Sequence, residues 1–243
     1  MRIKKDLHFH TNMSDGSNSP YDMFMTYFKK NYNVLSVTDH GCIDAIPIMS
    51  QLCAQHNIKF INGIEISTDD YPNMHILGYS FDETSPALLD LIKTIKHNRR
   101  VFLKKAMKIL SLHKIDAEHF WALEKDESIE FLYENNVPSD FLYNCEKPSA
   151  MQAIEVINES GGVAVLAHPS KLGFSIYTLR NILKKLKTYG LKGLECYHPS
   201  QQGKEDKYVR LSREFDLIVT GGSDSHSIDL HNYTEHYQIE IIF

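Results

Sequence analysis

The stretch Asp6-Leu7-His8-Phe9-His10-Thr11 decides how the rest of the chain is interpreted, because an apolar strand pattern there ends in two metal-type side chains. Successive side chains of a β-strand point to opposite faces, so His8 and His10 share one face and Phe9 lies on the other. Imidazole is the commonest metal ligand, and two rings at this spacing can bind one ion. We therefore expect a strand whose carboxyl end carries part of a metal site.

The remainder of the chain repeats this strand pattern, and an amphipathic segment of helix length usually follows each strand. A strand followed by a helix, repeated, predicts a parallel sheet with helices outside it. Seven strands in a chain of this length favour a closed or nearly closed barrel over two separate domains. The expected strands are residues 3–8, 34–38, 58–67, 75–81, 163–167, 190–196 and 217–220. The expected helices between them are residues 20–30, 44–57, 148–159, 176–189 and 204–215.

Length and composition fit one α/β barrel domain that spans residues 1–243. The chain has 243 residues, of which 42% are apolar and 23% charged, and a formal net charge of -5. An α/β barrel often reaches about 200–250 residues as a single domain. No apolar run approaches the roughly 20 residues that a bilayer span needs, and the first residues lack a signal-peptide pattern. We expect a cytoplasmic enzyme with no membrane partner.

Residues 85–146 interrupt the alternation and predict a small helical insertion within the barrel domain. A long helical pattern covers Pro86–Leu112, and a shorter one covers residues 117–123. The apolar positions of the long segment fit the core side of a helix better than a functional groove. After the last strand, residues 233–243 alternate apolar and polar side chains, which predicts an edge strand or a tail packed on the barrel.

Cysteine usage and net charge exclude several classes of protein. The four cysteines are widely spaced and contain no CxxC pair, so the sequence suggests neither a disulfide framework nor a thiolate zinc site. A mildly acidic body argues against tight, sequence-independent binding to long duplex nucleic acid, because such binding depends on Lys and Arg. A small or single-stranded anion remains a suitable ligand for a local positive site.

Histidine is the anomaly of the composition, because the chain has 13 histidines and several of them lie with carboxylates near the expected strand ends. The loops at the carboxyl ends of barrel strands converge on one pocket, where such enzymes place their chemistry. Glu65 lies inside an apolar strand, where a carboxylate is costly to bury without a cation. His75 precedes its apolar run, so its spacing offers no argument for a place at the same edge. The candidate metal ligands are His8, His10, Asp15, His40, Glu65, His75, His168, Asp224 and His226.

Each candidate ligand taken alone has an ordinary explanation as a helix cap or a hydrogen-bonded surface group. Together, six histidines and three carboxylates at the edges of one barrel indicate a metal site. A zinc site uses about four ligands, and a catalytic one about three and a water. Nine ligands therefore predict two or three divalent ions. Histidine and carboxylate ligands suit manganese, iron or zinc, and the sequence does not choose among them.

The motifs that contain the candidate ligands resemble those of the polymerase and histidinol phosphatase (PHP) family. They occur in the same order as in that family and extend over nearly the whole chain. The resemblance implies a distorted (β/α)7, TIM-like barrel and a trinuclear metal centre that cleaves phosphate esters. It implies that Glu65 bridges two ions. The implied ligand sets are His8, His10, Glu65 and Asp224 for one ion, Glu65, His75 and His168 for the second, and Asp15, His40 and His226 for the third. The motifs are Asp6-Leu7-His8-Phe9-His10-Thr11, Ser14-Asp15-Gly16, Thr38-Asp39-His40, Gly63-Ile64-Glu65-Ile66-Ser67, His75-Ile76-Leu77-Gly78-Tyr79, Leu166-Ala167-His168-Pro169 and Gly222-Ser223-Asp224-Ser225-His226.

Within that family the chain is most similar to the small stand-alone phosphoesterases that act on nucleotide phosphates and short RNA. The segment Gly193-Leu194-Glu195-Cys196-Tyr197-His198-Pro199 resembles theirs, which implies that His198 lies near the phosphate. The chain departs from them where the insertion ends, because Cys145-Glu146-Lys147-Pro148-Ser149 replaces a motif of the glycine-arginine-proline-histidine type. This departure affects the expected recognition of substrate more than the expected chemistry.

The favoured function is hydrolysis of small phosphomonoesters, with nucleotide phosphates as the substrate class, by a metal-activated hydroxide. His198 is either a donor to the leaving oxygen or an ordinary surface histidine. Candidate phosphate-binding cations are Arg99, Arg100 and Lys171, each of which has a solvated surface role as its alternative. Asp6 and Asp39 are expected to accept the second ring N–H of a ligand histidine, or to act in turns.

Three alternatives stay open. A 5'-3' exonuclease on short single-stranded RNA or DNA would share the metal centre and differ in the shape of its pocket. A histidinol-phosphate phosphatase would belong to the same enzyme class as the favoured function. A non-catalytic metal-binding module is the third alternative, against which the completeness of the nine ligand positions argues.

Overall fold

The computed structural model describes residues 3–116, 131–132, 134–135, 137 and 145–230. The expected helix at 117–123 and the expected final segment at 233–243 lie outside the described residues. The chain divides into two compact units, one formed by Met1–Ile92 with Pro148–Phe243 and the other by Lys93–Lys147. The single barrel domain over 1–243, with its insertion at 85–146, stays a prediction.

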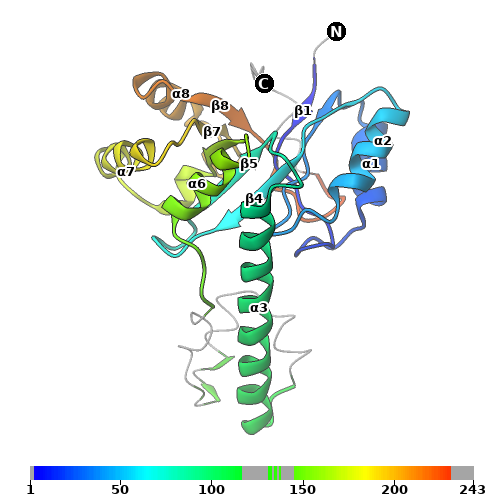
Figure 1. Cartoon of the computed structure of the whole chain (residues 1–243), viewed down its shortest axis with the longest axis vertical. Helices are drawn as coiled ribbons and strands as arrows, with labels where there is room; N and C mark the ends of the chain where they lie inside the picture. Colours follow the sequence, from blue (N-terminus) through cyan, green and yellow to red (C-terminus); the bar gives the residue numbers. More distant parts are fainter. Residues whose placement is uncertain (1–2, 117–130, 133, 136, 138–144, 231–243) are drawn as a thin grey trace. The chain divides into compact units, whose positions relative to one another are not determined.

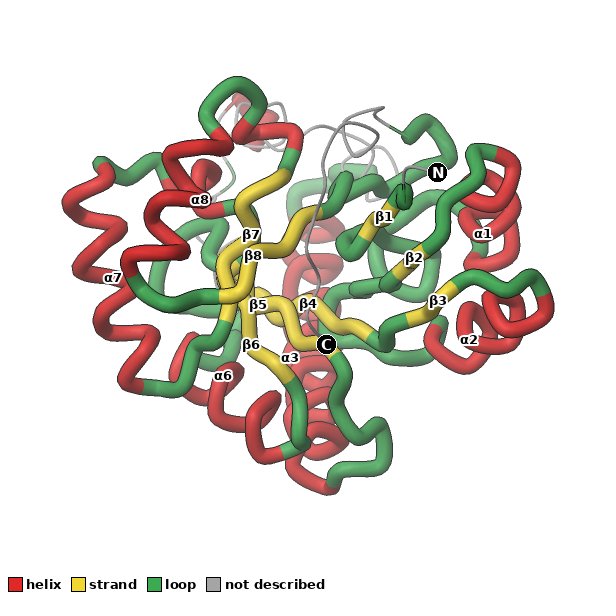
Figure 2. Tube along the Cα trace, turned by 90° about the horizontal axis from the view of Figure 1, so that it is seen from above, coloured by secondary structure: helices red, strands yellow, loops and turns green. Residues whose placement is uncertain are grey.

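The strands of the first unit form two sheets (Figure 2). The first is parallel and consists of β1 (Lys5–Asp6), β2 (Val34–Leu35) and β3 (Lys59–Phe60), in that order. In the second sheet β5 is antiparallel to both of its neighbours, β4 and β6, and the pairs β6–β7 and β7–β8 are parallel. The second sheet contains, in spatial order, β4 (Gly63–Ser67), β5 (His75–Tyr79), β6 (Val163–Leu166), β7 (Gly193–Tyr197) and β8 (Ile218–Gly221).

The expected strand at residues 58–67 divides into two strands that belong to different sheets. Ile61 still donates its backbone N–H to Leu35 O at 3.0 Å, as part of the first sheet. Two residues later, Gly63 pairs with Tyr79 in the second sheet. A continuous apolar run does not reveal such a change of partner, because its side chains are buried in both sheets. The sequence predicts a closed or nearly closed barrel of seven parallel strands. The described residues form two sheets, with β5 antiparallel to its neighbours, and no closed barrel.

Short backbone contacts beyond the strands join the two sheets at both of their edges. On one side Phe9 forms a parallel bridge with Ser225, and Asp224 donates its N–H to His8 O at 2.7 Å. On the other side His40 forms a parallel bridge with Glu65. All six of these residues belong to the motifs of the expected metal site. The two sheets thus meet where the candidate ligands lie.

The helices of the first unit begin and end within about two residues of their expected bounds, which confirms those predictions. Serine side chains cap three of them, because Ser19, Ser149 and Ser175 each accept a backbone N–H of the first helical turn. Among the helices and strands in contact, α2 packs beside β3, α6 beside β5 and β6, and α8 beside β7 (Figure 1). These helices are α1 (Pro20–Lys29), α2 (Ile46–Gln55), α6 (Ala150–Glu159), α7 (Ile176–Thr188) and α8 (Glu205–Glu214).

The second unit contains most of helix α3, which covers Pro86–Leu112 as predicted. The unit has its own small core, whose members include Ala106, Leu110, Leu132 and Val137. Ala106 and Leu110 of α3 thus pack inside this unit. Nearer the start of the helix, Leu88, Leu91 and Ile92 are buried, which agrees with the core interpretation of its apolar pattern. No helix among the described residues combines the length and the apolar character that crossing a bilayer requires.

The core of the first unit contains side chains from both sheets. Leu7 and Val34 come from the first sheet and its extension, while Leu77, Tyr79 and Val165 come from the second. Tyr79 is fully buried, and its hydroxyl donates a hydrogen bond of 2.8 Å to Leu7 O. This bond links the second sheet to the segment that carries His8.

We predict that Tyr79→Phe lowers the free energy of unfolding by about 1–2 kcal/mol, because the buried Leu7 carbonyl loses its donor while packing is kept. Denaturant unfolding followed by circular dichroism measures this change. The matched control is Tyr177→Phe, since Tyr177 is 73% exposed. Equal stabilities of the two variants would contradict the role given to the Tyr79 hydroxyl.

Candidate metal centre

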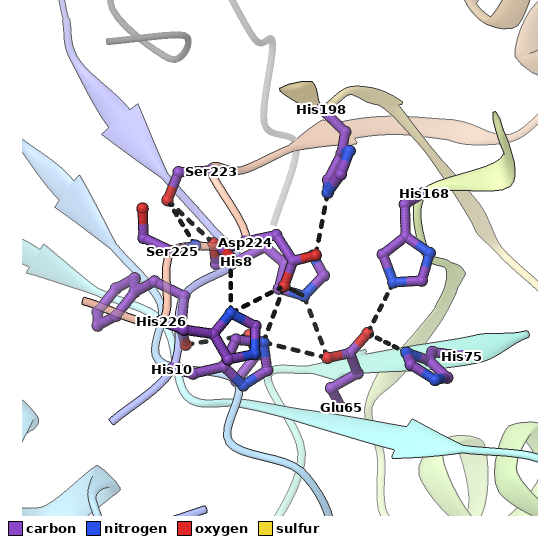
Figure 3. A network of polar contacts seen from close by, with 12 residues as sticks. His8, His10, Glu65, His75, His168, His198, Ser223, Asp224, Ser225 and His226 are labelled. Carbon is purple, nitrogen blue, oxygen red and sulfur yellow. Dashed lines mark hydrogen bonds and ion pairs between the residues drawn. The ribbon is translucent and has the colours of Figure 1, made fainter. Parts of the chain in front are cut away.

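All nine predicted metal ligands lie in one network of polar contacts, which Figure 3 shows in part. Eight of them lie in or just after β1, β2, β4, β6 and β8, toward the carboxyl ends of these strands. The ninth, His75, begins β5. Three overlapping groups each present one ligand atom per residue, with the atoms of a group within 4.8 Å of one another. The groups are His10, Asp15, His40 and His226; His8, His10, Glu65 and Asp224; and His40, Glu65 and His75.

Glu65 occupies the centre of this network and is only 1% exposed. Its atom Oε1 lies 2.8 Å from His75 Nδ1 and 3.0 Å from His168 Nε2. Its atom Oε2 lies 3.2 Å from the Nε2 atoms of both His8 and His10. The two oxygens of one carboxylate therefore face two different sets of histidines, as a bridging ligand would.

The antiparallel direction of β5 explains why His75 precedes its apolar run. Residues 68–74 connect β4 to β5, and such a short loop permits only an antiparallel pair, since a parallel pair needs a crossover of a dozen or more residues. In this pair His75 lies opposite Ser67, at the carboxyl end of β4. The amino end of β5 thus lies at the same edge as the carboxyl ends of its antiparallel neighbours β4 and β6, and His75 joins the site.

Asp224 approaches the pair of histidines after β1 through an unusually close backbone contact. Its Oδ1 lies 3.1 Å from His10 Nε2 and 3.3 Å from His8 Nε2. Two residues earlier, a Cβ atom at Gly222 would lie 2.3 Å from His8 Cβ, so no other residue fits there without movement. Asp224 itself has a left-handed backbone, with φ 54°. These local constraints bring the loop after β8 against the end of β1.

The third group lies around Asp15 and is open to solvent. Asp15 Oδ2 lies 3.6 Å from His40 Nε2 and 3.4 Å from His226 Nε2, and Oδ1 lies 3.6 Å from His10 Nδ1. The ring of His10 stacks on that of His226, with centroids 4.2 Å apart. Asp15 and His226 have side chains that are 37% and 43% exposed. His10 therefore belongs to a buried group through Nε2 and faces an exposed group through Nδ1.

Asp6 and Asp39 do not make the expected contact with a histidine ring. Asp6 accepts the backbone N–H groups of His8 and Ser223 at 3.2 and 3.0 Å. Asp39 accepts the backbone N–H and the hydroxyl of Thr11, both at 2.7 Å, which fixes the loop that leads to Asp15. The expected ring contact was wrong for both residues, because a carboxylate next to a strand end also lies within reach of unpaired backbone donors. The contacts of Asp39 with Thr11 fit the turn role that was its alternative.

Glu195 is the site residue that the sequence reasoning missed. It lies fully buried in β7, where its Oε1 lies 3.0 Å from His8 Nδ1 and its Oε2 accepts the backbone N–H of His168 at 2.7 Å. The signal was present in the sequence, because Glu195 is a carboxylate inside an apolar strand, as Glu65 is. The cost of burying a carboxylate in an apolar strand marks Glu195 in the same way as it marks Glu65.

His198 lies inside the site and not on the surface, since it is only 2% exposed. Its Nδ1 accepts the backbone N–H of Ser200 at 3.0 Å, so the ring proton lies on Nε2, which is 3.1 Å from Asp224 Oδ2. Lys171 also reaches the site, with Nζ 2.5 Å from Asp224 Oδ2. Arg99 and Arg100 belong to the other compact unit, so their role at a phosphate stays a prediction.

The buried carboxylates of the cluster are stabilised by positive charge on their neighbours, as the shifted pKa values show. Burial alone would lower the pKa of His10, but the hydrogen bond to Asp224 and the nearby carboxylate of Glu65 outweigh it and raise that pKa to about 9. Burial would also lower the pKa of His8, but the carboxylates of Glu195, Glu65 and Asp224 raise it well above its usual value. Burial would raise the pKa of Glu65, yet the surrounding histidines hold it well below its usual range. Burial lowers the pKa of His40 to about 4, which keeps that ring neutral.

Unpaired buried atoms test whether divalent cations fit this site. Within the described part of the chain, His8 Nε2, His10 Nδ1 and Glu65 Oε2 are buried and have no hydrogen-bond partner. Buried polar atoms nearly always have a partner, and those that lack one call for an explanation such as an ion. Because His8 Nδ1 donates to Glu195, Nε2 is the nitrogen that faces Glu65 Oε2 and would bind an ion once its proton is displaced. The residues present therefore fit the binding of divalent metal ions.

An α/β fold with a buried histidine and carboxylate cluster at one sheet edge defines a metal-dependent hydrolase. The chain belongs to the PHP domain family, whose model matches residues 6–156. The match confirms the resemblance inferred from the sequence. It includes the motifs from His8 to His75, whereas His168, Asp224 and His226 lie beyond the matched residues.

Several relatives match nearly the whole chain. A 5'-3' exoribonuclease from Haemophilus influenzae is 30% identical, over 93% of this chain and 91% of the relative. A phosphoribosyl 1,2-cyclic phosphate 1,2-diphosphodiesterase from Eggerthella lenta is 27% identical, over 91% of this chain and 94% of the relative. A 3',5'-nucleoside bisphosphate phosphatase from Chromobacterium violaceum is 24% identical, over 91% and 87%. All three names denote hydrolysis of phosphate esters, which confirms the predicted enzyme class, a phosphoric ester hydrolase.

A solved structure supports the fold. The structure described as an amidohydrolase from Chromobacterium violaceum, with bound sulfate and no metal, aligns with a TM-score of 0.77. The two chains are 23% identical, and the alignment covers 93% of this chain and 88% of the other. At this identity the likeness concerns the fold alone.

We predict that the affinity for Mn²⁺ rises as the pH is raised from 6 to 8. His10 has a pKa raised to about 9, so it is protonated throughout this range, and a metal must displace that proton. Each proton displaced makes the affinity up to tenfold stronger per pH unit. Isothermal titration at several pH values measures this dependence, and an affinity that does not change between pH 6 and pH 8 would contradict it.

Proposed function

We propose that this chain is a metal-dependent phosphoesterase that hydrolyses small phosphomonoesters, with nucleotide phosphates as the favoured substrates. The observation that carries the proposal is the position of Glu65, whose two oxygens each face a different set of histidines at less than 3.5 Å. Such an arrangement suits two ions that share one carboxylate. Phosphate ester hydrolysis is the chemistry for which neighbouring ions are best suited, because they neutralise the phosphate oxygens and supply hydroxide near neutral pH.

Three ligand sets are proposed. The group His8, His10, Glu65 and Asp224 would hold one ion, and Asp15, His40 and His226 would hold another. For the remaining ion we propose Glu65, His75 and His168. The close approach of His168 Nε2 to Glu65 Oε1, at 3.0 Å, supports His168 over His40 in this set, since His40 faces the other oxygen. Manganese, iron and zinc all suit these ligands.

His198 is proposed to act on the leaving group. Its Nε2 carries the ring proton and points to Asp224 Oδ2, at the edge of the cluster (Figure 3). A substrate phosphate bound at the ions would bring its leaving oxygen within reach of this N–H, which could donate a hydrogen bond or a proton. The ammonium of Lys171, next to the same carboxylate, would contribute positive charge for the phosphate. Arg99 and Arg100 are proposed as further phosphate ligands.

The second candidate function is 5'-3' exonuclease activity on short single-stranded RNA or DNA. The observation in its favour is the relative from Haemophilus influenzae, named an exoribonuclease, which is 30% identical over 93% of this chain. The two functions need the same metal centre and differ in whether the pocket admits a chain or one nucleotide. Hydrolysis of histidinol phosphate is a further alternative within the same enzyme class.

We also propose that the two sheets are parts of one distorted (β/α)7 barrel over residues 1–243, with a helical insertion at 85–146. The parallel bridges Phe9–Ser225 and His40–Glu65 support this proposal, because they continue the sheets toward each other on both sides. A cytoplasmic location remains a prediction from the sequence.

The proposed function is tested by phosphate release from manganese-loaded protein with 3',5'-bisphosphorylated nucleotides, mononucleotides and histidinol phosphate. We expect release from the nucleotides, reduced about 100-fold or more in His168→Ala, since a ligand matters at least as much as the outer partners of a metal site. The matched control is His56→Ala, because His56 is exposed and precedes β3 at the amino end of its sheet. That variant should keep its activity.

The outcomes separate the candidates. Digestion of a 5'-labelled oligonucleotide without phosphate release from nucleotides would favour the exonuclease. Wild-type protein that binds metal and hydrolyses neither class, or a His168→Ala variant that retains full turnover, would contradict the proposed function.

A further inference from the structure

Glu195 is a buried carboxylate that lies beside the candidate metal ligands without being one of them. It is fully buried in β7, between Leu194 and Cys196, which are also fully buried. The register of β7 against β8 shifts after Glu195, and such irregularities re-aim side chains next to functional sites. Burying a charge is costly unless it is paired and hydrogen-bonded, so the partners of this carboxylate matter.

One oxygen of Glu195 fixes the ring of His8. Oε1 lies 3.0 Å from His8 Nδ1, and a carboxylate can only accept, so Nδ1 carries the proton. In the neutral ring that a metal ion would bind, the lone pair is then on Nε2, which lies 3.2 Å from Glu65 Oε2 and 3.3 Å from Asp224 Oδ1. The contact therefore selects the tautomer that presents His8 to the first ion set.

The other oxygen fixes the backbone of His168. Oε2 accepts the backbone N–H of His168 at 2.7 Å. His168 has φ 23° and ψ 60°, a conformation that L residues rarely adopt, and Pro169 follows it. Residues held in such conformations persist only where surrounding contacts over-determine them. In this conformation the ring of His168 places Nε2 3.0 Å from Glu65 Oε1, on the side opposite to His8.

We propose that Glu195 is a positioning residue that prepares the two ion sets on either side of Glu65 at once, through the tautomer of His8 and the backbone of His168. The inference rests on the proposed function, since it takes both histidines as metal ligands. It assigns Glu195 no contact with substrate. The third set, around Asp15, lies outside its reach, because none of the contacts of Glu195 involves Asp15, His40 or His226.

Only a carboxylate can accept hydrogen bonds from both the ring of His8 and the backbone of His168 at this position. His8 Nδ1 and His168 N are both donors, and they contact different oxygens of Glu195. A glutamine has one acceptor oxygen, and its NH₂ group would face the second donor. Glu195→Gln therefore keeps the size of the side chain and disrupts one of the two contacts.

The test is metal binding by apo protein, measured by competition with a chelator for Mn²⁺ and by the visible absorption spectrum of the Co²⁺-loaded protein. In Glu195→Gln we expect 10–100-fold weaker binding at one or both of the two ion sites beside Glu65, while the third site keeps its affinity, together with a changed Co²⁺ spectrum. The matched control is Glu214→Gln, which removes the same charge from an exposed residue paired with Arg180. This control should bind all ions as the wild type does.

Three results would overturn the proposal. They are affinities within twofold of the wild type with an unchanged Co²⁺ spectrum, an equal loss at all ion sites, and an equal loss in Glu214→Gln. If Glu195→Gln does not fold by circular dichroism, Glu195→Asp is compared in the same way, since it keeps the charge but withdraws the oxygens by one methylene. Wild-type protein that binds no metal would overturn the proposed function, and this inference with it.

Discussion

The carboxylate of Glu65 is the constraint on which the rest of the site depends. It is buried in β4, and five histidines from four different segments lie within 3.5 Å of its two oxygens. A charge in such a place is tolerated only with compensating partners, so each segment must deliver its imidazole to within contact distance. The bridge between His40 and Glu65 and the pairing of Ser67 with His75 show how the backbone meets that requirement. The two sheets are joined by the same residues that the chemistry needs.

The sequence predicted which residues come together in the candidate site better than how the strands that carry them are arranged. His8, His10 and Glu65 were predicted from local pattern, because the alternation of a strand decides which side chains share a face. The direction of β5 depends on the length of a loop, and the division of residues 58–67 depends on which strands lie nearby. The apolar periodicity of the sequence reveals neither the direction of β5 nor the division of residues 58–67. The short connection before His75 does indicate an antiparallel pair.

The carboxylates around the histidines show a second limit of prediction from sequence. Asp6 and Asp39 were expected to contact rings because they are near ligand histidines in the chain. In the fold they accept backbone N–H groups, and the ring of His8 is held by Glu195, 187 residues away. Which carboxylate reaches a ring is a property of the folded strands, so a sequence can mark Glu195 as unusual without naming its partner.

The candidate ligands differ in their access to water, and this has a consequence for how the centre would exchange its ions. Glu65 is 1% exposed, whereas the side chains of Asp15 and His226 are 37% and 43% exposed. An ion held by the outer pair could leave by exchanging one ligand at a time for water, while an inner ion must first lose its protein cover. The centre should therefore empty in stages from the outside, and preparations of the protein would differ first in the content of the outer position.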